Sequence, residues 1–254
     1  MKSLEVLFTP ADFEALSRRQ LEETYCVVFD VLRATSTMVT ALANVAAGII
    51  PVAGIPPALA IKSQDPRVLL AGEREGVRIR AALTGSIDFD LGNSPREFTG
   101  ERVRGRTVVM TTTNGTRALH ACQAAQAVLA CSFLNLTATA EFLQRQRPPR
   151  LLVVCSGTRE QTAYEDALGA GALCELLSRQ IAVAEPADST WMARDLYRAA
   201  KANLTQALLS SRNGSRLAAI PELRDDVAFC AQIDKLHLVA ELTRDGVLRE
   251  RALS

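Results

Sequence analysis

The sequence predicts an α/β protein with a mostly parallel sheet, or two such sheets, and helices on both faces. Short apolar runs alternate with longer segments of helical period along most of the 254 residues. Several of these runs are apolar without interruption, which is the pattern of a parallel strand buried on both faces. Residues 25–30 show this pattern most clearly.

The first half of the chain alternates regularly. We predict strands over residues 4–8, 25–30, 49–52, 68–71 and 107–110, and helices over residues 10–23, 35–47, 57–64 and 116–125. Pro10 suits the first turn of a helix, and Gly48 suits a helix end. Residues 75–95 interrupt the alternation, because they are rich in Gly, Asp, Ser and Arg and lack a helical period. Loops of this length are usually functional or mobile.

The second half continues the alternation and then changes. Strands are predicted over residues 128–130 and 151–155, helices over residues 137–147 and 164–179, and a wholly helical segment over residues 188–233. Residues 236–242 and 247–251, joined by Arg244-Asp245-Gly246, resemble a C-terminal β-hairpin. We expect two α/β lobes, residues 1–128 with the phosphate and metal loops and residues 129–254 completing the site.

The composition excludes several classes of protein. Apolar residues make up 48% of the chain and charged residues 22%, with a net charge of +1, so no global field attracts nucleic acid or an anionic membrane. The six cysteines lack Cys-x-x-Cys spacing and read as buried, reduced thiols of a cytoplasmic protein. Two histidines are too few for a zinc site, and we expect no signal peptide and no membrane span. A small homodimer is the default assembly.

Polar, turn-forming sequence follows four of the predicted strands. In parallel sheets ligands bind beyond the carboxyl ends of the strands, so the recurrence points to one anion site. The four segments are Asp30 to Thr37, Gly72-Glu73-Arg74, Thr111 to Arg117, and Ser156-Gly157-Thr158-Arg159.

The segment from Asp30 to Thr37, which begins at the last residue of the strand predicted over residues 25–30, combines three kinds of group. Asp30 can hold a divalent cation, and Arg33 can hold a phosphate group in a bidentate fork. Thr35, Ser36 and Thr37 open a helix, where unpaired amides favour an anion and the hydroxyls add donors. The alternative is an ordinary helix cap with an incidental arginine.

The other segments could also bind a phosphate group or a metal ion, and each could instead be an ordinary turn, helix start or surface ion pair. Asn114 and Gly115 predict a tight turn with exposed amides, Thr116 caps a helix, and Arg117 lies in its first turn. Glu73 and Arg74 offer a metal ligand and a phosphate clamp, or simply a solvated ion pair. Weaker candidates are Gly157 and Thr158 with Asp166 downstream, and Asn93 and Ser94 before Pro95, where an ordinary turn or helix start is the alternative.

Other phosphate chemistries do not fit. Neither Cys26 and Arg33 nor Cys155 and Arg159 have the Cys-x5-Arg spacing of a cysteine phosphatase. Position 32 is Leu, so the second aspartate of a haloacid-dehalogenase-type phosphatase is missing. A Walker P-loop and a Gly-x-Gly-x-x-Gly motif are also absent from the sequence.

The ordered motifs closely resemble those of the 2-phosphosulfolactate phosphatase family. They are Asp30-Val-Leu-Arg-Ala-Thr-Ser-Thr37, Gly72-Glu73-Arg74, Gly92-Asn93-Ser94-Pro95 and Thr111-Thr-Thr-Asn-Gly-Thr-Arg117. The resemblance is dense from residue 25 to residue 116 and continues more thinly through Ser156-Gly-Thr158 and Glu165-Asp166. It implies a two-lobed α/β fold and a Mg²⁺-dependent hydrolase that converts 2-phosphosulfolactate to 3-sulfolactate and phosphate.

We hypothesise that Asp30, Glu73 and Asp166 converge on Mg²⁺ and that Arg33 neutralises the phosphoryl oxygens. Arg74, Arg117 and Arg159 could add positive charge for a substrate with three acidic groups. A water attacks in line, or Asp30 forms a covalent aspartyl-phosphate; Asp234 is a candidate for the general acid. Two other functions stay open: a phosphatase for another phosphorylated hydroxy acid, and a non-catalytic anion-binding module.

Overall fold

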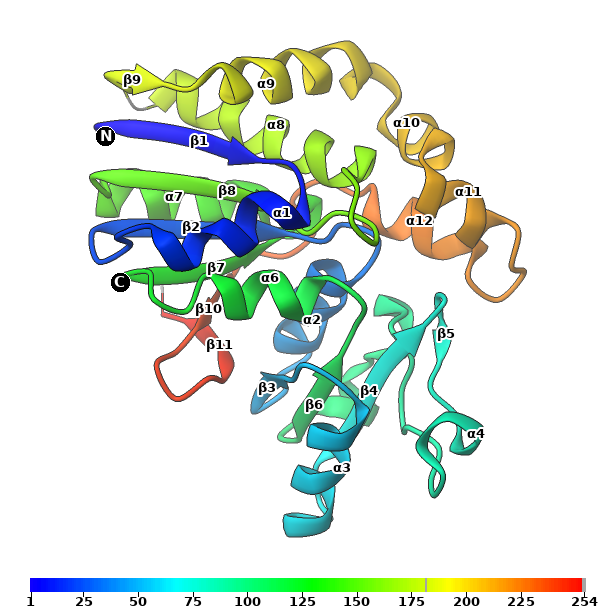
Figure 1. The fold of residues 1–254 in the computed structure, drawn as a ribbon. Coiled ribbons are helices and arrows are strands. Elements are labelled where there is room, and N and C mark those ends of the chain that lie inside the picture. The colour runs from blue at the N-terminus through cyan, green and yellow to red at the C-terminus, as the bar shows by residue number, and fades with distance from the viewer. Residues whose placement is uncertain (181, 253–254) are drawn as a thin grey trace.

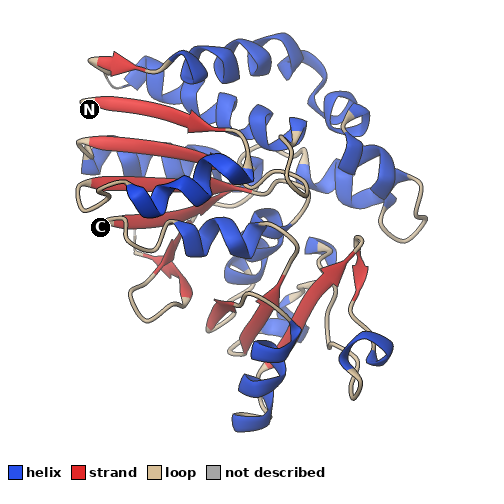
Figure 2. Cartoon of the chain, viewed as in Figure 1, coloured by secondary structure: helices blue, strands red, loops and turns tan. Residues whose placement is uncertain are grey.

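A computed structural model describes residues 1–180 and 182–252 and contains one mixed sheet of eleven strands flanked by helices (Figures 1 and 2). The strand order is β5-β4-β6-β3-β11-β10-β7-β2-β8-β1-β9. The strands are β1 (Ser3–Leu7), β2 (Thr24–Phe29), β3 (Gly48–Pro51), β4 (Leu69–Arg74), β5 (Val77–Arg78), β6 (Thr107–Thr111), β7 (Ala127–Cys131), β8 (Arg150–Cys155), β9 (Glu185–Pro186), β10 (Val239–Leu242) and β11 (Leu248–Arg251). The predicted α/β class is confirmed.

The helices fall between the strands in the first two thirds of the chain and follow one another after β9. They are α1 (Pro10–Glu14), α2 (Ala34–Ala43), α3 (Ile55–Gln64), α4 (Ala81–Thr84), α5 (Gly100–Val103), α6 (Gly115–Ala121), α7 (Leu136–Gln146), α8 (Tyr164–Gln180), α9 (Asp188–Ala200), α10 (Leu204–Ser210), α11 (Arg212–Ala218) and α12 (Arg224–Cys230). Short 3₁₀ turns are η1 (Ala15–Arg18), η2 (Pro95–Glu97), η3 (Phe133–Asn135) and η4 (Lys201–Asn203). Helices therefore fill most of residues 188–233, as predicted.

Two parallel groups of strands make up most of the sheet. Strands β9, β1, β8, β2 and β7 form one group, and β3, β6 and β4 form the other. The predicted C-terminal hairpin is present as β10 and β11, and it joins the groups through antiparallel pairing with β7 and β3. Strand β2 lies between β7 and β8, which come from the second half of the chain. The division into lobes at residue 128 stays a prediction.

The core explains why the central strands are continuously apolar. Val27 and Phe29 of β2 pack with α7 and α8 on one face, whereas Cys26 and Val28 pack with α1, α2 and α6 on the other. Every residue of β2 is buried. All six cysteines are buried and unpaired, as the sequence predicts.

The first helix is shorter than predicted. Thr9 and Asp12 form a capping box around Pro10, but α1 ends at Glu14 and η1 ends at Arg18. Arg19 is extended, and this brings Leu21 into the same apolar cluster as Phe13 and Leu16. Packing of Leu21 therefore overrides continuation of the helix to residue 23.

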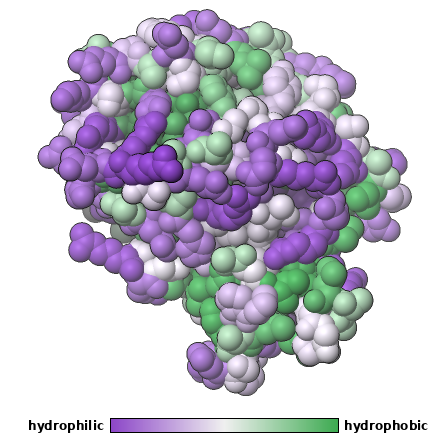
Figure 3. All heavy atoms as spheres, viewed as in Figure 1, coloured by the Kyte–Doolittle hydropathy of each residue, from purple (hydrophilic) through white to green (hydrophobic). Residues whose placement is uncertain are grey.

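The outer surface is polar over most of the face that Figure 3 shows. Apolar residues gather toward the lower end of that view, where Figure 1 places α3 and strands β3, β4 and β6. Over the described part of the chain, no helix has both the length and the apolar character needed to cross a bilayer.

Helix α9 lies close against α8, and Gly171 makes this approach possible. A Cβ atom added at Gly171 would overlap the backbone carbonyl of Ala193 in α9. We predict that Gly171→Ala lowers the free energy of unfolding by about 1–3 kcal/mol, although alanine is the better helix former.

The matched control is Gly100→Ala at the start of α5, where the added methyl group would meet no atom closer than 3.5 Å. Chemical denaturation of both variants checks the prediction. Equal stability changes would contradict the close contact between α8 and α9.

Candidate active site

One pocket lies where four strands end, and it draws residues from both parallel groups. Asp30 follows β2, Glu73 lies near the end of β4, Asn114 follows β6 and Gly157 follows β8, and all four line the pocket. Figure 1 shows the arrowheads of β2, β8 and β4 directed toward this region. The structure thus brings together the four polar segments that the sequence singles out.

Two helices from the second half of the chain complete the pocket. Glu165 and Asp166 come from the first turn of α8, and Asn213, Arg216 and Leu217 come from α11. Asn213 donates from Nδ2 to Glu165 Oε1 at 2.5 Å and to Thr158 Oγ1 at 2.6 Å. Helix α11 is therefore tied directly to the strand-end residues.

Asp30 directly follows β2 and is only partly buried. Its Oδ1 accepts a hydrogen bond from the backbone N–H of Ala34, the first residue of α2, at 3.0 Å. Its Oδ2 lies against Gly115, where an added Cβ would come within 2.6 Å of this oxygen. Burial raises the pKa of Asp30 to about 6, the Ala34 bond opposes this, and the charge of Glu73 adds to it.

Asp166 is buried and holds two strand-end loops together. Its Oδ1 accepts from the N–H of Val31 at 2.8 Å, and its Oδ2 accepts from Ser156 Oγ at 3.0 Å and from the N–H of Gly157 at 3.1 Å. Burial, followed by the charges of Asp30 and Glu165, raises its pKa well above the usual range. Asp30 and Asp166 therefore resist simultaneous ionisation.

Glu73 organises the opposite side of the pocket. Its Oε1 accepts from the N–H and the hydroxyl of Thr113 at 3.0 and 2.9 Å, and its Oε2 accepts from the N–H of Gly76 at 2.8 Å. Glu75 and Gly76 connect β4 to β5, with φ values of 54° and 82°. Positive φ at both central residues suits a tight hairpin, so Glu73 fixes this turn relative to the loop after β6.

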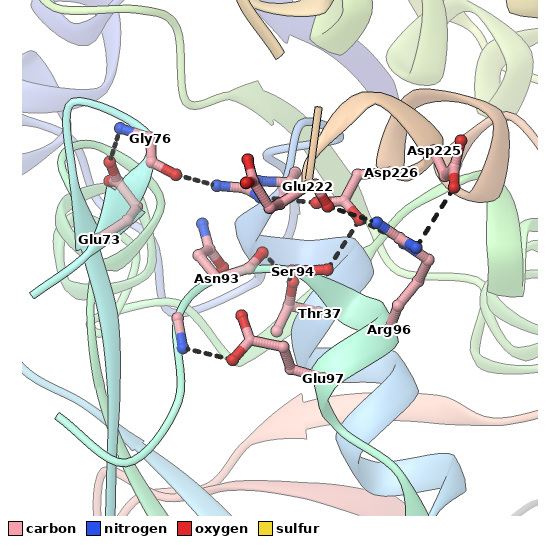
Figure 4. Close-up of polar contacts among 12 residues, drawn as sticks. Thr37, Glu73, Gly76, Asn93, Ser94, Arg96, Glu97, Glu222, Asp225 and Asp226 are labelled. Atoms are coloured by element: carbon pink, nitrogen blue, oxygen red, sulfur yellow. Dashed lines mark hydrogen bonds and ion pairs between the residues drawn. The ribbon is translucent and has the colours of Figure 1, made fainter. Parts of the chain in front are cut away.

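Arg33 is buried in an ion pair behind the pocket. Its Nη1 donates to Asp226 Oδ2 at 2.6 Å and its Nη2 donates to the carbonyl of Gly76 at 2.5 Å. Asp226 Oδ1 also accepts from Ser94 Oγ at 2.7 Å and from Arg96 Nε at 2.8 Å (Figure 4). The side chains of Arg33 and Asp226 are 2% and 0% exposed, so this network is a fixed part of the pocket wall.

The predicted hydroxyl donors of α2 are turned inward. The hydroxyls of Thr35 and Ser36 donate to the carbonyls of Asp30 and Val31, and that of Thr37 donates to the carbonyl of Asn93. The three side chains are fully buried and do not line the pocket. The anion at the first amide of α2 is the carboxylate of Asp30 itself, because the helix begins at Ala34.

The remaining predicted residues divide between the pocket and its surroundings. Asn93, Asn114, Gly157 and Thr158 line the pocket. Ser94 bonds to Asp226, and Gly115 and Thr116 are buried at the start of α6. Arg74 donates to the carbonyl of Glu73, and Arg117 pairs with Glu14 and Glu160; neither lines the pocket.

Asp234 lies outside the pocket. Its two carboxylate oxygens accept from the N–H and the hydroxyl of Thr137, and it lines a separate hollow with Glu175 and Tyr197.

The sequence did not predict several of the residues that line the pocket. Those not proposed as site residues are Leu32, Glu75, Gly76, Thr112, Thr113, Glu165, Asn213, Arg216 and Leu217, with Asp226 behind the wall. Glu165 has a usable signal, because it stands beside Asp166 at the start of a helix. Asn213, Arg216 and Asp226 lie in short helices whose sequences carry no sign of a site.

The donor chemistry of the pocket fits Mg²⁺, which prefers oxygen ligands and keeps several waters. The buried amide oxygens of Asn93 and Asn114 have no hydrogen-bond partner among the described residues. Glu73 and Asp166 each keep one oxygen that accepts a single bond, and a carboxylate offers about four acceptor positions. Within residues 1–180 and 182–252, however, no three His, Cys, Asp or Glu side chains cluster as a metal site. A Mg²⁺ ion would therefore take one or two carboxylates here and complete its shell with water and phosphate oxygens.

The sequence model of the family described as 2-phosphosulpholactate phosphatase matches residues 11–245. A protein of Caldanaerobacter subterraneus subsp. tengcongensis is 35% identical over 247 residues, covering 96% of this chain and 97% of the relative. A protein of Pseudothermotoga lettingae is 36% identical over 248 residues (97% and 99%), and one of Synechococcus sp. is 40% identical over 228 residues (87% and 90%). Each relative is named "Probable 2-phosphosulfolactate phosphatase". The resemblance seen in the ordered motifs is confirmed, and the chain belongs to the 2-phosphosulfolactate phosphatase family, a family of phosphoric monoester hydrolases.

Proposed function

We propose that this protein is a Mg²⁺-dependent phosphatase that hydrolyses 2-phosphosulfolactate to 3-sulfolactate and phosphate. The observation that carries the proposal is the position of Asp30, a partly buried carboxylate with one oxygen left in a pocket that Arg33 also lines, where four strands end. The names of the relatives supply the substrate. Mg²⁺, when bound, supplies positive charge that offsets the charge shifted in the transition state.

Arg33 and the loops have binding and positioning roles in this proposal. A guanidinium group has five N–H donors, and the bonds to Asp226 and Gly76 use two of them. The other N–H groups are offered to the phosphoryl oxygens, in a geometry fixed by Asp226. One or two of the carboxylates of Asp30, Glu73 and Asp166 would hold the metal ion, while Glu73 and Asp166 also keep the loops in place.

The leaving group is a secondary alkoxide that needs a proton. Asp30 and Asp166 repel each other's charge, so the pair retains a proton at higher pH than isolated carboxyl groups do. The member of this pair that does not bind the metal ion, rather than the distant Asp234, is our candidate for the general acid. Attack by water and attack by Asp30 Oδ2 are the two mechanisms compatible with the position of Asp30.

The first prediction of the proposed function concerns activity and metal. The purified protein should release inorganic phosphate from 2-phosphosulfolactate with Mg²⁺ present, and a chelator should reduce the rate at least a hundredfold until Mg²⁺ is added back. A phosphate-release assay over a panel of small phosphate esters measures this. No release from any ester would favour the anion-binding module, and undiminished rates with chelator would exclude the metal.

The second prediction is that Asp30→Asn abolishes turnover yet stabilises the fold when chelator is present. The pKa of Asp30 is raised from 3.8 to about 6, so the folded state binds more protons than the unfolded state in this range. The free energy of unfolding therefore falls as pH rises from 3.8 to about 6, and the neutral variant avoids this loss.

The expected gain at pH 7 is about 3 kcal/mol, and it should vanish well below pH 3.8, where both proteins are neutral at this position. Urea denaturation at several pH values measures it. A variant that is less stable than the parent at pH 7 would contradict the raised pKa of Asp30.

The third prediction concerns the ion pair behind the pocket. Asp226→Asn should lower the free energy of unfolding by about 3 kcal/mol, because it leaves the buried Arg33 without its counter-ion, and kcat/KM should fall at least tenfold. Asp225→Asn is the matched control: its side chain is 74% exposed and lies 3.5 Å from Arg96, so it should cost less than about 1 kcal/mol. Similar losses in the two variants would remove the special role of Asp226.

A further inference from the structure

We propose that Arg159 and Arg216 bind the sulfonate group of the substrate at the mouth of the pocket, and that Glu75 competes for the same two guanidinium groups. This inference rests on the proposed phosphatase function and deepens it. It assigns substrate choice to residues outside the buried carboxylate and Arg33 cluster.

The two arginines converge on a single oxygen atom. Arg216 Nη1 lies 3.4 Å from Glu75 Oε2, and Arg159 Nη2 lies 3.6 Å from the same Oε2. They come from different elements, Arg159 from the loop after β8 and Arg216 from α11, and all three residues line the pocket. Two forks aimed at one acid oxygen form a receptor for an anionic group.

The charge balance of the pocket requires such a receptor. Five acidic residues and three arginines line it. Arg33, which is 2% exposed, is already neutralised by Asp226. With three acidic groups of its own, a substrate with a phosphate, a carboxylate and a sulfonate needs further cations besides Mg²⁺ to offset this charge. Arg159 and Arg216 are the remaining cationic side chains among the described lining residues.

Glu75 and Arg159 hold their side chains at the opening of the pocket with a backbone conformation that their residue types disfavour. Glu75 and Arg159 both have positive φ values, 54° and 56°, which non-glycine residues rarely adopt. Their side chains are 73% and 74% exposed, so the ion pair with Glu75 is held loosely in water. A loose, solvated pair can be exchanged for a substrate anion at little cost, whereas the buried pair of Arg33 cannot.

The sulfonate is the group that fits this position. The phosphate must lie near Asp30 for hydrolysis, and the sulfonate is one bond farther from the phosphorus atom than the carboxylate is. Its three oxygens can accept from both guanidinium groups, as the carboxylate of Glu75 does with one oxygen. The sulfonate therefore reaches Arg159 and Arg216, while the phosphate ester stays near Asp30.

The test compares 2-phosphosulfolactate with 2-phospholactate, which carries a hydrogen atom in place of the sulfonate. Arg159→Ala and Arg216→Ala should each lower the ratio of kcat/KM for the two esters about tenfold. Glu75→Gln should raise this ratio, because the neutral amide competes less for the arginines. The matched controls are Arg80→Ala and Asp88→Asn, an exposed pair at 3.0 Å outside the pocket, which should leave the ratio within twofold.

An unchanged ratio in both arginine variants would overturn the proposal, and so would a Glu75→Gln variant that loses selectivity as they do.

Calorimetric binding of 3-sulfolactate, which carries no phosphate, separates this proposal from the phosphatase function. If the protein hydrolyses no ester but binds 3-sulfolactate about tenfold more tightly than the Arg159→Ala/Arg216→Ala variant does, the sulfonate site stands and the reaction does not. Equal affinities would overturn the sulfonate site.

Discussion

The buried ion pair between Arg33 and Asp226 is the contact on which the shape of the pocket depends. The two residues are 193 positions apart in the chain, and their charged atoms lie 2.6 Å apart with almost no exposure to water. A charge at this depth is tolerated only when it is paired and hydrogen-bonded. Asp226 meets this condition with bonds from Ser94 and Arg96 as well. The pair therefore fixes α12, the loop before η2 and the start of α2 in one arrangement.

The floor of the pocket has the opposite character, because its charges are not balanced. Burial raises the pKa of both Asp30 and Asp166; the charge of Asp30 adds to the shift of Asp166, and the charges of Glu73 and Glu165 add to that of Asp30. The first amide of α2 and the loop after β8 offset part of this cost. A binding site commonly carries such local instability, since groups arranged for a cation or a transition state are poorly arranged for stability. The hydrogen bonds from the N–H groups of Val31 and Gly157 to Asp166 tie its carboxylate to the segment that carries Asp30.

The sequence alone predicts the strand-end residues well, and for a physical reason. A parallel strand places its functional groups immediately after an apolar run, so Asp30, Glu73, Asn114 and Gly157 can be found by local pattern. The direction of a side chain cannot be found in this way. Thr35 to Thr37 carry the right donors, but the helix begins at Ala34 and their hydroxyls bond to nearby carbonyls.

Tertiary contacts account for the rest of what the sequence does not predict. Asp226 and Arg216 lie in helices of seven residues whose sequences indicate only a helix. The hairpin of β10 and β11 is evident from its turn, yet its place in the middle of the sheet depends on which strand edges are left for it to pair with. These features follow from how distant segments meet, which local periodicity does not encode.

The residues assigned to hydrolysis and the residues assigned to substrate choice come from different elements of the fold. The groups assigned to phosphate and metal follow strands of the sheet and are locked by buried bonds. The groups assigned to the sulfonate lie on a two-residue turn, an exposed loop and α11, and their contacts are exposed and weak. Substitutions at the rim leave the buried network intact, so the same floor can serve esters with different acidic groups. A family with one hydrolytic centre can therefore vary its substrate through α11 and the turn at Glu75 without rebuilding the ion pair on which the floor depends.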